Sequence, residues 1–375
     1  MRNLNILQIN SAKVWGGGEV HLYQLCHGLA KRGHNVTVIG RKGSELVDRL
    51  SDLSIEVKEL PLRGAADIES IIKIAAIIKN KDIDIIHLHM GRGYWLGILA
   101  HKLVRQGKVV ITRHILSSLG QNFVHKWLYK SIDGFIAVSQ AVKEILVNKN
   151  EFDESEIQVI YNGVDIDEFN LEIESGLKQE LEIKEDEFLI GTVGRLGIKK
   201  NQELLIKAAA ILKESNPEIK YVIVGKDSSP KKSYEQKLHR LIREFKVEDR
   251  VVLLGFRENI SKILADLDLL VIPSKEESFG IIAVEGMAME VPVIASGVGG
   301  LKEVIKDEET GILFAMDEVN ELCESIIELI DNESKRDKLS KIGRREVERR
   351  FSVGRMLEET INLYHKLTGS STGHL

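Results

Sequence analysis

Cysteine is scarce in this chain, and no apolar run is long enough to span a bilayer. The 375 residues include only Cys26 and Cys323. Each lies on an expected helix in a different half of the chain, which argues against a disulfide and fits a reducing compartment. The N-terminal residues run directly into an apolar strand without the pattern of a signal peptide. We therefore expect a cytoplasmic protein without a membrane-spanning segment.

Acidic residues are absent from residues 91–132, which carry seven Lys and Arg residues interleaved with Tyr94, Trp95, Trp127 and Tyr129. More broadly, residues 1–150 hold 21 Lys+Arg against 12 Asp+Glu, although the whole chain has a net charge of -5. Two interpretations stay open for residues 91–132. One is a surface for an anionic membrane or acceptor, which would place the protein at the inner face of the cytoplasmic membrane. The other is a core helix with solvated basic residues around it. No nucleic-acid-binding motif accompanies the charge, so nucleic acid is not an expected partner.

The length predicts two domains, because 375 residues exceed what one hydrophobic core usually supports. Apolar strand patterns alternate with amphipathic helix patterns in the first half and begin again near residue 188. This alternation predicts an α/β fold with two Rossmann-like domains facing a central cleft. We expect residues 1–180 to form the first domain and residues 181–351 the second, with a helix over about 352–367 packing back on the first. The expected strands cover residues 4–10, 35–39, 83–89, 109–112, 134–138, 188–193, 220–224, 251–254, 269–272 and 293–295.

Two carboxylates, Glu277 and Glu285, flank an expected loop-to-helix junction in the second half. If the whole interval were helical, the two residues would lie roughly 12 Å apart along the axis. A retaining glycosidase needs its two carboxyl groups about 5 Å apart. The spacing therefore argues against a hydrolytic pair and favours one carboxylate at each end of an extended ligand, such as a nucleotide sugar. Between them, amides around Phe279, Gly280 and Ile281 would lie at a helix N-terminus, which attracts phosphate.

A glycine run, Gly16-Gly17-Gly18, follows the first strand and opens a helix. Three glycines permit close approach of a ligand to the backbone and leave amides at the helix start. A plain turn explains the run equally well, and the spacing departs from the dinucleotide-binding fingerprint.

Two cations follow the first strand of the second half, Arg195 and Lys200. They are placed to clamp a diphosphate, since charge-assisted bonds to phosphate are strong. The alternative is a loop with scattered surface cations.

Clusters with metal-ligand spacing are not apparent, so no metal site and no cofactor are expected. Three Asp-x-Asp strings occur, at residues 82–84, 165–167 and 266–268. The first and third precede apolar strands and the second lies in the expected linker. We interpret all three as strand or turn borders.

Taken in order, these motifs resemble family four of the glycosyltransferases (glycosyl transferases group 1), retaining enzymes of the GT-B fold. The resemblance covers nearly the full length. It rests on residues 16–19, 31–36, 84–89, 160–165, 194–196, Lys200, Glu277 with Glu285, and 292–300.

The resemblance implies a role for each donor-site residue. Glu277 would bind hydroxyls of the transferred sugar, and Glu285 would bind the nucleotide ribose. Arg195 and Lys200 would neutralise the diphosphate as the glycosidic bond breaks. Amides near Gly17 and Ile281 would complete the phosphate cradle.

Further residues follow from the same resemblance. His114 matches the family's cleft histidine, expected near the donor sugar and counted here among the catalytic residues. Gly299 and Gly300 would let a loop approach the sugar. The nucleobase of a UDP- or GDP-linked donor is expected near Gly255-Phe256-Arg257. One departure is Asn201, where relatives often have glycine; because Lys200 is retained, activity is still expected.

The expected function is retaining transfer of a hexose-type sugar to an acceptor hydroxyl in bacterial-type polysaccharide, lipopolysaccharide or glycolipid synthesis. The partners would be the nucleotide-sugar donor and a saccharide or lipid-linked acceptor. Two alternatives stay open: a nucleotide-sugar 2-epimerase of the same architecture, and a non-catalytic sugar-nucleotide binding protein.

Overall fold

The computed structural model describes residues 2–51, 53 and 55–369. The chain forms two compact units. The first contains the residues up to Gly163 together with those from Val353 onward, and the second contains residues 164–352.

The first unit is built on a seven-stranded parallel sheet with strand order β3-β2-β1-β4-β5-β6-β7. Its central strands are almost wholly buried, which is why they appear in the sequence as continuous apolar runs. The strands are β1 (Asn5–Asn10), β2 (Asn35–Arg41), β3 (Glu56–Leu60), β4 (Ile85–Leu88), β5 (Lys108–Arg113), β6 (Gly134–Ala137) and β7 (Ile157–Val159).

Helices connect the strands of the first unit, as parallel pairing requires. Side-chain caps begin several of them; for example, Asp67 accepts a hydrogen bond from the amide of Ser70, and Ser139 accepts one from the amide of Val142. The helices are α1 (Gly17–Lys31), α2 (Glu45–Leu50), α3 (Ile68–Asn80), α4 (Gly91–Val104), α5 (Phe123–Tyr129), α6 (Gln140–Asn150), a short 3-10 helix (Glu154–Glu156) and α15 (Val353–Thr368).

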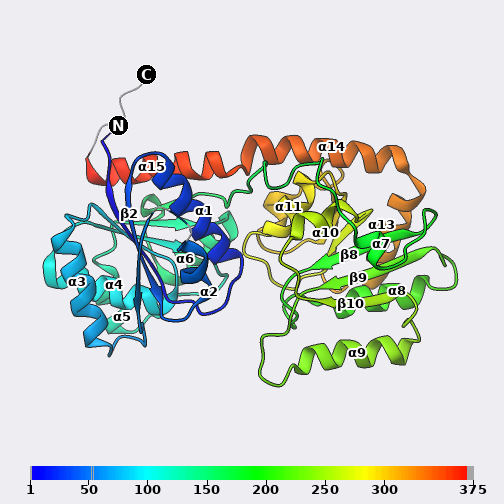
Figure 1. The fold of residues 1–375 in the computed structure, drawn as a ribbon, viewed down its shortest axis with the longest axis horizontal. Helices are drawn as coiled ribbons and strands as arrows, with labels where there is room; N and C mark the ends of the chain where they lie inside the picture. The colour runs from blue at the N-terminus through cyan, green and yellow to red at the C-terminus, as the bar shows by residue number, and fades with distance from the viewer. Residues whose placement is uncertain (1, 52, 54, 370–375) are drawn as a thin grey trace. The chain divides into compact units, whose positions relative to one another are not determined.

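The last helix, α15, belongs to the first unit and packs beside α1 (Figure 1). Leu357 is buried against Gly28, where even one added carbon would collide with the leucine side chain. A helix over about 352–367 is expected from the sequence to pack on the first domain, and α15 occupies this position within its unit.

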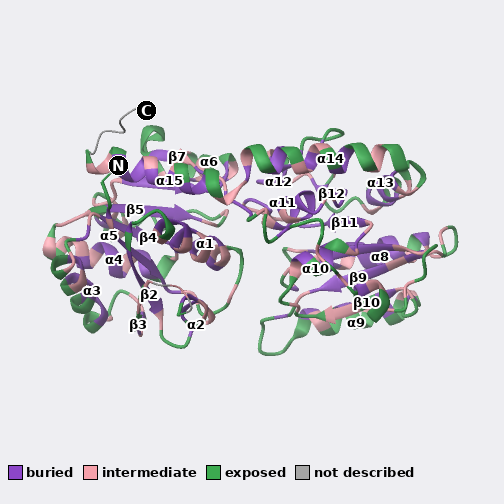
Figure 2. Cartoon of the chain, turned by 45° about the horizontal axis from the view of Figure 1, so that its top comes forward, coloured by how far each residue is buried: buried purple, intermediate pink, exposed green. Residues whose placement is uncertain are grey.

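The second unit repeats the architecture with a six-stranded parallel sheet of order β10-β9-β8-β11-β12-β13. Its strands are β8 (Phe188–Val193), β9 (Ile219–Val224), β10 (Val251–Gly255), β11 (Leu269–Ile272), β12 (Val293–Ser296) and β13 (Ile312–Phe314). Its helices are α7 (Leu177–Glu180), α8 (Glu203–Leu212), α9 (Ser233–Phe245), α10 (Ile260–Ala265), α11 (Ile281–Ala288), α12 (Leu301–Val304), α13 (Val319–Asp331) and α14 (Glu333–Arg350). In Figure 2, β11 is buried whereas α9 carries exposed residues.

The α/β fold with two Rossmann-like domains is therefore confirmed, but the boundary differs from the expected position at residues 180 and 181. Residues 164–180 belong to the second unit. Val164 donates its amide to the carbonyl of Phe351 at 2.8 Å, and Lys178 forms an ion pair with Asp268 at 2.9 Å. The polar, turn-rich composition of this segment predicted a linker, whereas its backbone and charged contacts attach it to the second unit.

The Asp-x-Asp strings lie at the borders of strands and of a turn, as predicted. Asp84 accepts a hydrogen bond from the amide of Asn5 at 2.9 Å, and Asp268 accepts one from the amide of Leu189 at 2.7 Å. Asp165 accepts the amide of Asp167 within a turn. Among the described residues, no helix combines the length and the apolar character needed to cross a bilayer.

Candidate active site

The predicted donor residues of the second unit lie in loops at one edge of its sheet. Because all its strands are parallel, the loops after β8, β9, β10, β11 and β12 leave the same edge. Ligands of open α/β sheets bind at this carboxyl edge. The sheet therefore gathers residues 194–201, 255–257, 277–281 and 299–300 along one side.

The loop after β8 carries Arg195 and Lys200 in different surroundings. Arg195 is exposed, and its guanidinium makes no ion pair or hydrogen bond among the described residues. Lys200 is partly buried and forms an ion pair with Glu277. Asn201, with φ 54°, adopts the left-handed conformation that glycine favours and asparagine tolerates. This conformation accounts for the expected glycine of relatives at that position.

Several contacts tie the loop after β8 to the loop after β11. Lys275 donates its amide to the carbonyl of Lys199 at 2.8 Å, and the Lys199 side chain pairs with Glu276 at 2.6 Å. The Lys200–Glu277 pair is the least exposed of these contacts, since the Glu277 side chain is only 13% exposed. The predicted diphosphate cation and the predicted sugar-binding carboxylate are thus in direct contact.

Glu285 lies on α11, in densely packed surroundings that still leave it some solvent-accessible surface. Burial and, to a lesser extent, the nearby Glu168 carboxylate together raise the pKa of Glu285 to about 8. The carboxyl is therefore largely protonated at neutral pH in the ligand-free unit. In this form it can donate a hydrogen bond as well as accept one.

The start of α11 has the geometry expected for an anion site. Gly280 caps the helix with φ 97°, a left-handed conformation that favours glycine, and its carbonyl accepts the amide of Ala283. The amides of Ile281 and Ile282, which precede it in the first turn, have no carbonyl one turn earlier in the helix to bind. Phe279 is instead buried and packs edge-on against Phe351, so its side chain supports the loop from the core.

Gly299 and Gly300 follow the neighbouring strand β12, and Gly300 contacts the loop that precedes α11. Gly300 donates its amide to the carbonyl of Glu277 at 2.9 Å. A Cβ atom on Gly300 would lie 2.5 Å from the carbonyl oxygen of Ser278 and 2.6 Å from the Cα atom of Phe279. Gly300 therefore permits contact between two protein backbones.

The expected nucleobase region lies at the end of β10. The Phe256 side chain is 44% exposed, and the Nζ atom of Lys226 lies 4.4 Å from its ring centroid. Gly255 accepts the amide of Gly225 at 2.8 Å, which places the loops after β9 and β10 side by side. Arg257 forms an ion pair with Glu180. An exposed aromatic ring beside a cation is a surface on which a flat base can stack.

In the first unit, the glycine run and His114 lie together at the carboxyl edge of the sheet. Gly16 caps α1, and a Cβ atom on Gly18 would lie 3.7 Å from Cγ of His114. Glu19, the next residue along, is buried and accepts a hydrogen bond from Asn10 at 3.1 Å. Burial raises the pKa of Glu19.

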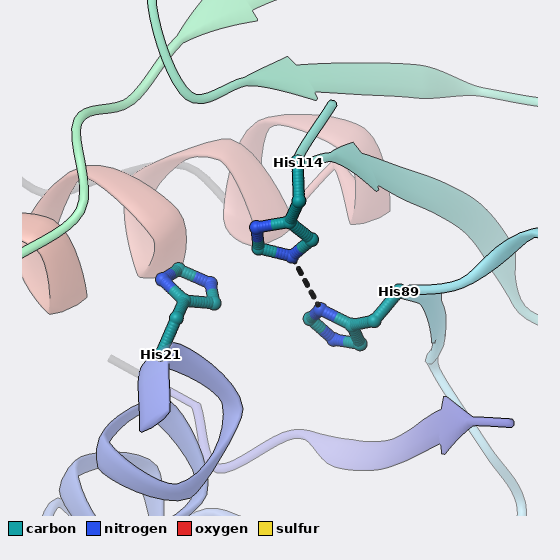
Figure 3. A group of neighbouring side chains, drawn as sticks. All are labelled: His21, His89 and His114. Carbon is teal, nitrogen blue, oxygen red and sulfur yellow. Dashed lines mark hydrogen bonds between the residues drawn. The ribbon is translucent and has the colours of Figure 1, made fainter. Parts of the chain in front are cut away.

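His114 is one of several histidines gathered at this edge (Figure 3). His21 comes from α1, His89 follows β4, and His114 follows β5. Burial holds the pKa of His89 and His114 well below the usual range and lowers that of His21 to about 4. These imidazoles are therefore neutral at physiological pH.

A buried hydrogen-bond chain connects this cluster to α15. His87 contacts the hydroxyl of Tyr364 and that of Thr112, both at 2.6 Å. Gln8 donates to Tyr364 at 3.4 Å, and its Oε1 atom lies 2.7 Å from Nε2 of His89. The last helix thus supplies a polar partner to the centre of the sheet.

Family comparison identifies both halves of the chain. Residues 15–168 match the family described as Glycosyltransferase Family 4, and residues 175–346 match the family described as Glycosyl transferases group 1. The chain is a glycosyltransferase of this type.

Known proteins resemble this glycosyltransferase over most of their length. It is 27% identical to an Escherichia coli enzyme named UDP-Gal:alpha-D-GlcNAc-diphosphoundecaprenol alpha-1,3-galactosyltransferase, covering 88% of each chain. A solved glycosyltransferase of Rickettsia africae superposes with a TM-score of 0.91 at 25% identity, covering 99% of this chain and 100% of the other. Anabaena HepE, solved in complex with UDP-glucose, shares the fold, with a TM-score of 0.87 at 24% identity over 97% of this chain and 100% of its own.

Within each unit, the structure also places residues beside the predicted site residues that the sequence did not indicate. Glu168, remote in sequence, acts on Glu285, and Lys226 covers Phe256. His21 and His89 join His114. The available signals were weak: a histidine pair, His87 and His89, at the end of an apolar strand, and a lysine after β9.

Proposed function

We propose that this glycosyltransferase moves a hexose-type sugar from a UDP- or GDP-linked donor to an acceptor hydroxyl, with retention of configuration. The observation that carries the proposal is the join between the loops after β8 and β11, where Lys200 contacts Glu277 and Arg195 stays unpaired on the same loop. Lys200 and Glu277 are in contact, and the diphosphate and the sugar of a nucleotide sugar are likewise adjacent. The cation can therefore bind the diphosphate while the carboxylate binds the sugar.

The donor would lie along the carboxyl edge of the second unit. Its diphosphate would meet Arg195, Lys200 and the first amides of α11, and its sugar hydroxyls would meet Glu277. The ribose would reach Glu285, and the base would stack near Phe256, which is 44% exposed. The positions of the two carboxylates support this order of sugar, diphosphate and ribose. Glu277 precedes the start of α11 and Glu285 lies on the helix, so the first amides of α11 lie between them.

Bond cleavage leaves negative charge on the departing diphosphate while the sugar gains oxocarbenium character. Arg195 and Lys200 would stabilise that charge, because fixed cations act most strongly where charge develops in the transition state. We propose front-face attack by the acceptor hydroxyl, whose proton passes to the leaving phosphate. In this proposal the two cations replace a catalytic metal, so EDTA should leave turnover largely intact. Complete loss of turnover that a metal ion restores would contradict this step.

His114 belongs to the first unit, and the family resemblance supports a role for it in binding sugar hydroxyls as a neutral imidazole. Burial keeps its pKa well below the usual range. A neutral ring can offer a hydrogen-bond donor and an acceptor to sugar hydroxyls without placing a positive charge beside an oxocarbenium centre.

The acceptor is proposed to be lipid-linked, in polysaccharide, lipopolysaccharide or glycolipid synthesis. The E. coli relative acts on a diphosphoundecaprenol-linked sugar, as its name states. Residues 91–132 of this chain expose Phe123 at 84% and Trp127 at 46%, with Lys102 stacked 4.1 Å from the Trp127 ring centroid. Exposed apolar side chains among lysines fit an anionic membrane surface.

A donor panel tests the proposed function. Binding of the correct nucleotide sugar should raise the melting temperature by mass action, and release of nucleoside diphosphate should require an acceptor. Epimerisation of UDP-N-acetylglucosamine without acceptor would instead show a 2-epimerase. Donor binding without turnover on any acceptor would show a non-catalytic binding protein.

A further inference from the structure

Three histidines of the first unit point toward a common centre at the carboxyl edge of its sheet (Figure 3). One nitrogen from each of His21, His89 and His114 can be chosen so that all lie within 4.8 Å of one another. They come from α1 and from the ends of the adjacent strands β4 and β5. The parallel sheet thus holds the three rings on separate, rigid elements.

Their spacing is close to that of imidazoles on one tetrahedral metal ion. Nitrogen-to-metal distances of about 2.0–2.1 Å place two coordinating nitrogens roughly 3.4 Å apart and their ring centroids roughly 5 Å apart. The ring centroids lie 5.0 Å apart for His21 and His114, 5.8 Å for His89 and His114, and 6.0 Å for His21 and His89. Nδ1 of His89 and Nε2 of His114 are 3.5 Å apart. Side-chain adjustments of an ångström or less would close the set around one ion.

The second ring nitrogen of His89 is occupied in the way that metal-binding histidines require. Nε2 of His89 lies 2.7 Å from Oε1 of Gln8, so the ring donates its proton there and turns the lone pair of Nδ1 toward His114. An outer partner of this kind fixes the tautomer and orientation of a metal ligand. Gln8 is itself held by Tyr364 of α15.

His21 provides the second, independent observation. It is only 4% exposed, and neither of its ring nitrogens has a hydrogen-bond partner in good geometry within the described part of the chain, although the Asn162 side chain is close enough to oppose the lowering of its pKa. Leaving buried polar groups unsatisfied costs about 1–3 kcal/mol each. An ion at the centre of the cluster would satisfy one of these nitrogens.

We propose that His21, His89 and His114 bind a divalent transition-metal ion such as Zn²⁺. The group contains imidazoles without carboxylates, which favours Zn²⁺, Co²⁺ or Ni²⁺ over Mg²⁺ or Ca²⁺. Three protein ligands leave a fourth position open. His114 is the most exposed of the three. The site uses residues of the first unit alone, and its binding test needs neither donor nor acceptor. It shares His114 with the proposed sugar contact, so an ion bound there would compete with the sugar for that ring.

Equilibrium dialysis of the full chain against Zn²⁺, with metal analysis, tests the site without any donor or acceptor. The wild type should bind one equivalent. His21→Ala and His89→Ala should each weaken Zn²⁺ binding by about 100-fold or more. Loss of a residue that only orients a metal ligand weakens binding by up to about 100-fold, and loss of a ligand itself should weaken it at least as much. His239→Ala, which removes an exposed histidine of α9, should bind as the wild type does. Equal affinity in all four proteins would overturn the proposal.

Zinc-edge X-ray absorption on the wild-type complex keeps the test valid if a histidine variant fails to fold. The proposal predicts three imidazole nitrogens at about 2.0–2.1 Å. A first shell with sulfur, or with oxygen and at most one imidazole, would overturn it.

Discussion

Individual residues of the donor site are held in protonation states and conformations that their neighbours determine. Asn201 takes a left-handed conformation that glycine adopts more readily, and Lys200 is placed against Glu277. The type and order of these residues were predictable because they follow apolar strands in a fixed sequence. The proximity of Glu168 to Glu285 was not, because it arises from folding of a segment remote in sequence.

Glu285→Gln should change the pH dependence of stability. The pKa of Glu285 rises from 4.5 to about 8 on folding, so the folded state holds a proton that the unfolded state releases between those values. This stabilising contribution is full below pH 4.5 and is lost as pH rises through 8. Relative to Glu285→Gln, the wild type should therefore lose about 2–4 kcal/mol of unfolding free energy between pH 5 and 8.5.

Urea unfolding of both proteins across that pH range measures the difference. The exposed Glu214→Gln is the matched control in the same unit and should follow the wild type at every pH. A constant offset between wild type and Glu285→Gln would show that the Glu285 carboxyl is ionised throughout.

At the scale of elements, the site depends on close contact between loops that leave neighbouring strands. Buried parallel strands such as β8 and β11 were readable from their apolar runs, and their predicted bounds match the structure. The edge strand β3 was missed because Glu56, Lys58 and Glu59 give it a charged sequence, as suits an unpaired edge. β13 has only three residues, too few for a pattern.

Gly300→Ala should disrupt the loop that carries Glu277. The added Cβ atom would meet Ser278 and Phe279 backbone atoms at 2.5 and 2.6 Å, and backbone cannot move aside as a flexible side chain can. We expect donor affinity to fall at least tenfold, measured by calorimetry with the donor found in the panel. Gly297→Ala is the control, since its Cβ atom would meet no atom closer than 3.6 Å. Equal affinity in the two variants would exclude a positioning role for Gly300.

At the scale of the whole molecule, the excess of basic residues in the first 150 residues coincides with an exposed apolar surface on the first unit. The first unit exposes apolar side chains on α5 within the stretch that lacks acidic residues. Composition alone left a core helix and a membrane surface equally open, because it cannot say which side of a helix faces solvent. The structure shows that α4 buries Tyr94 and Leu96 whereas α5 exposes Phe123, Val124 and Trp127.

Replacing both Phe123 and Trp127 by alanine should weaken binding to anionic liposomes tenfold or more, because the two rings lose burial in the bilayer interface. Sedimentation with phosphatidylglycerol vesicles measures this, and salt should weaken the wild type as well. Ile72→Ala removes an apolar side chain of α3 that is 58% exposed and should have no effect. Binding to neutral vesicles at high salt, unchanged by the double substitution, would argue against a membrane role for α5.

The central claim is that fixed cations of the second unit stabilise the departing diphosphate, and Arg195→Ala tests it most directly. Arg195 makes no ion pair among the described residues, so its removal leaves no partner uncompensated. Lys199→Ala, on the same loop and paired with Glu276, is the matched control. Steady-state kinetics with the identified donor and acceptor should show that kcat of Arg195→Ala is roughly 30- to 1,000-fold lower than that of the wild type. This decrease corresponds to a loss of about 2–4 kcal/mol of transition-state stabilisation. Lys199→Ala should keep turnover near that of the wild type. Wild-type kcat in Arg195→Ala would contradict the account.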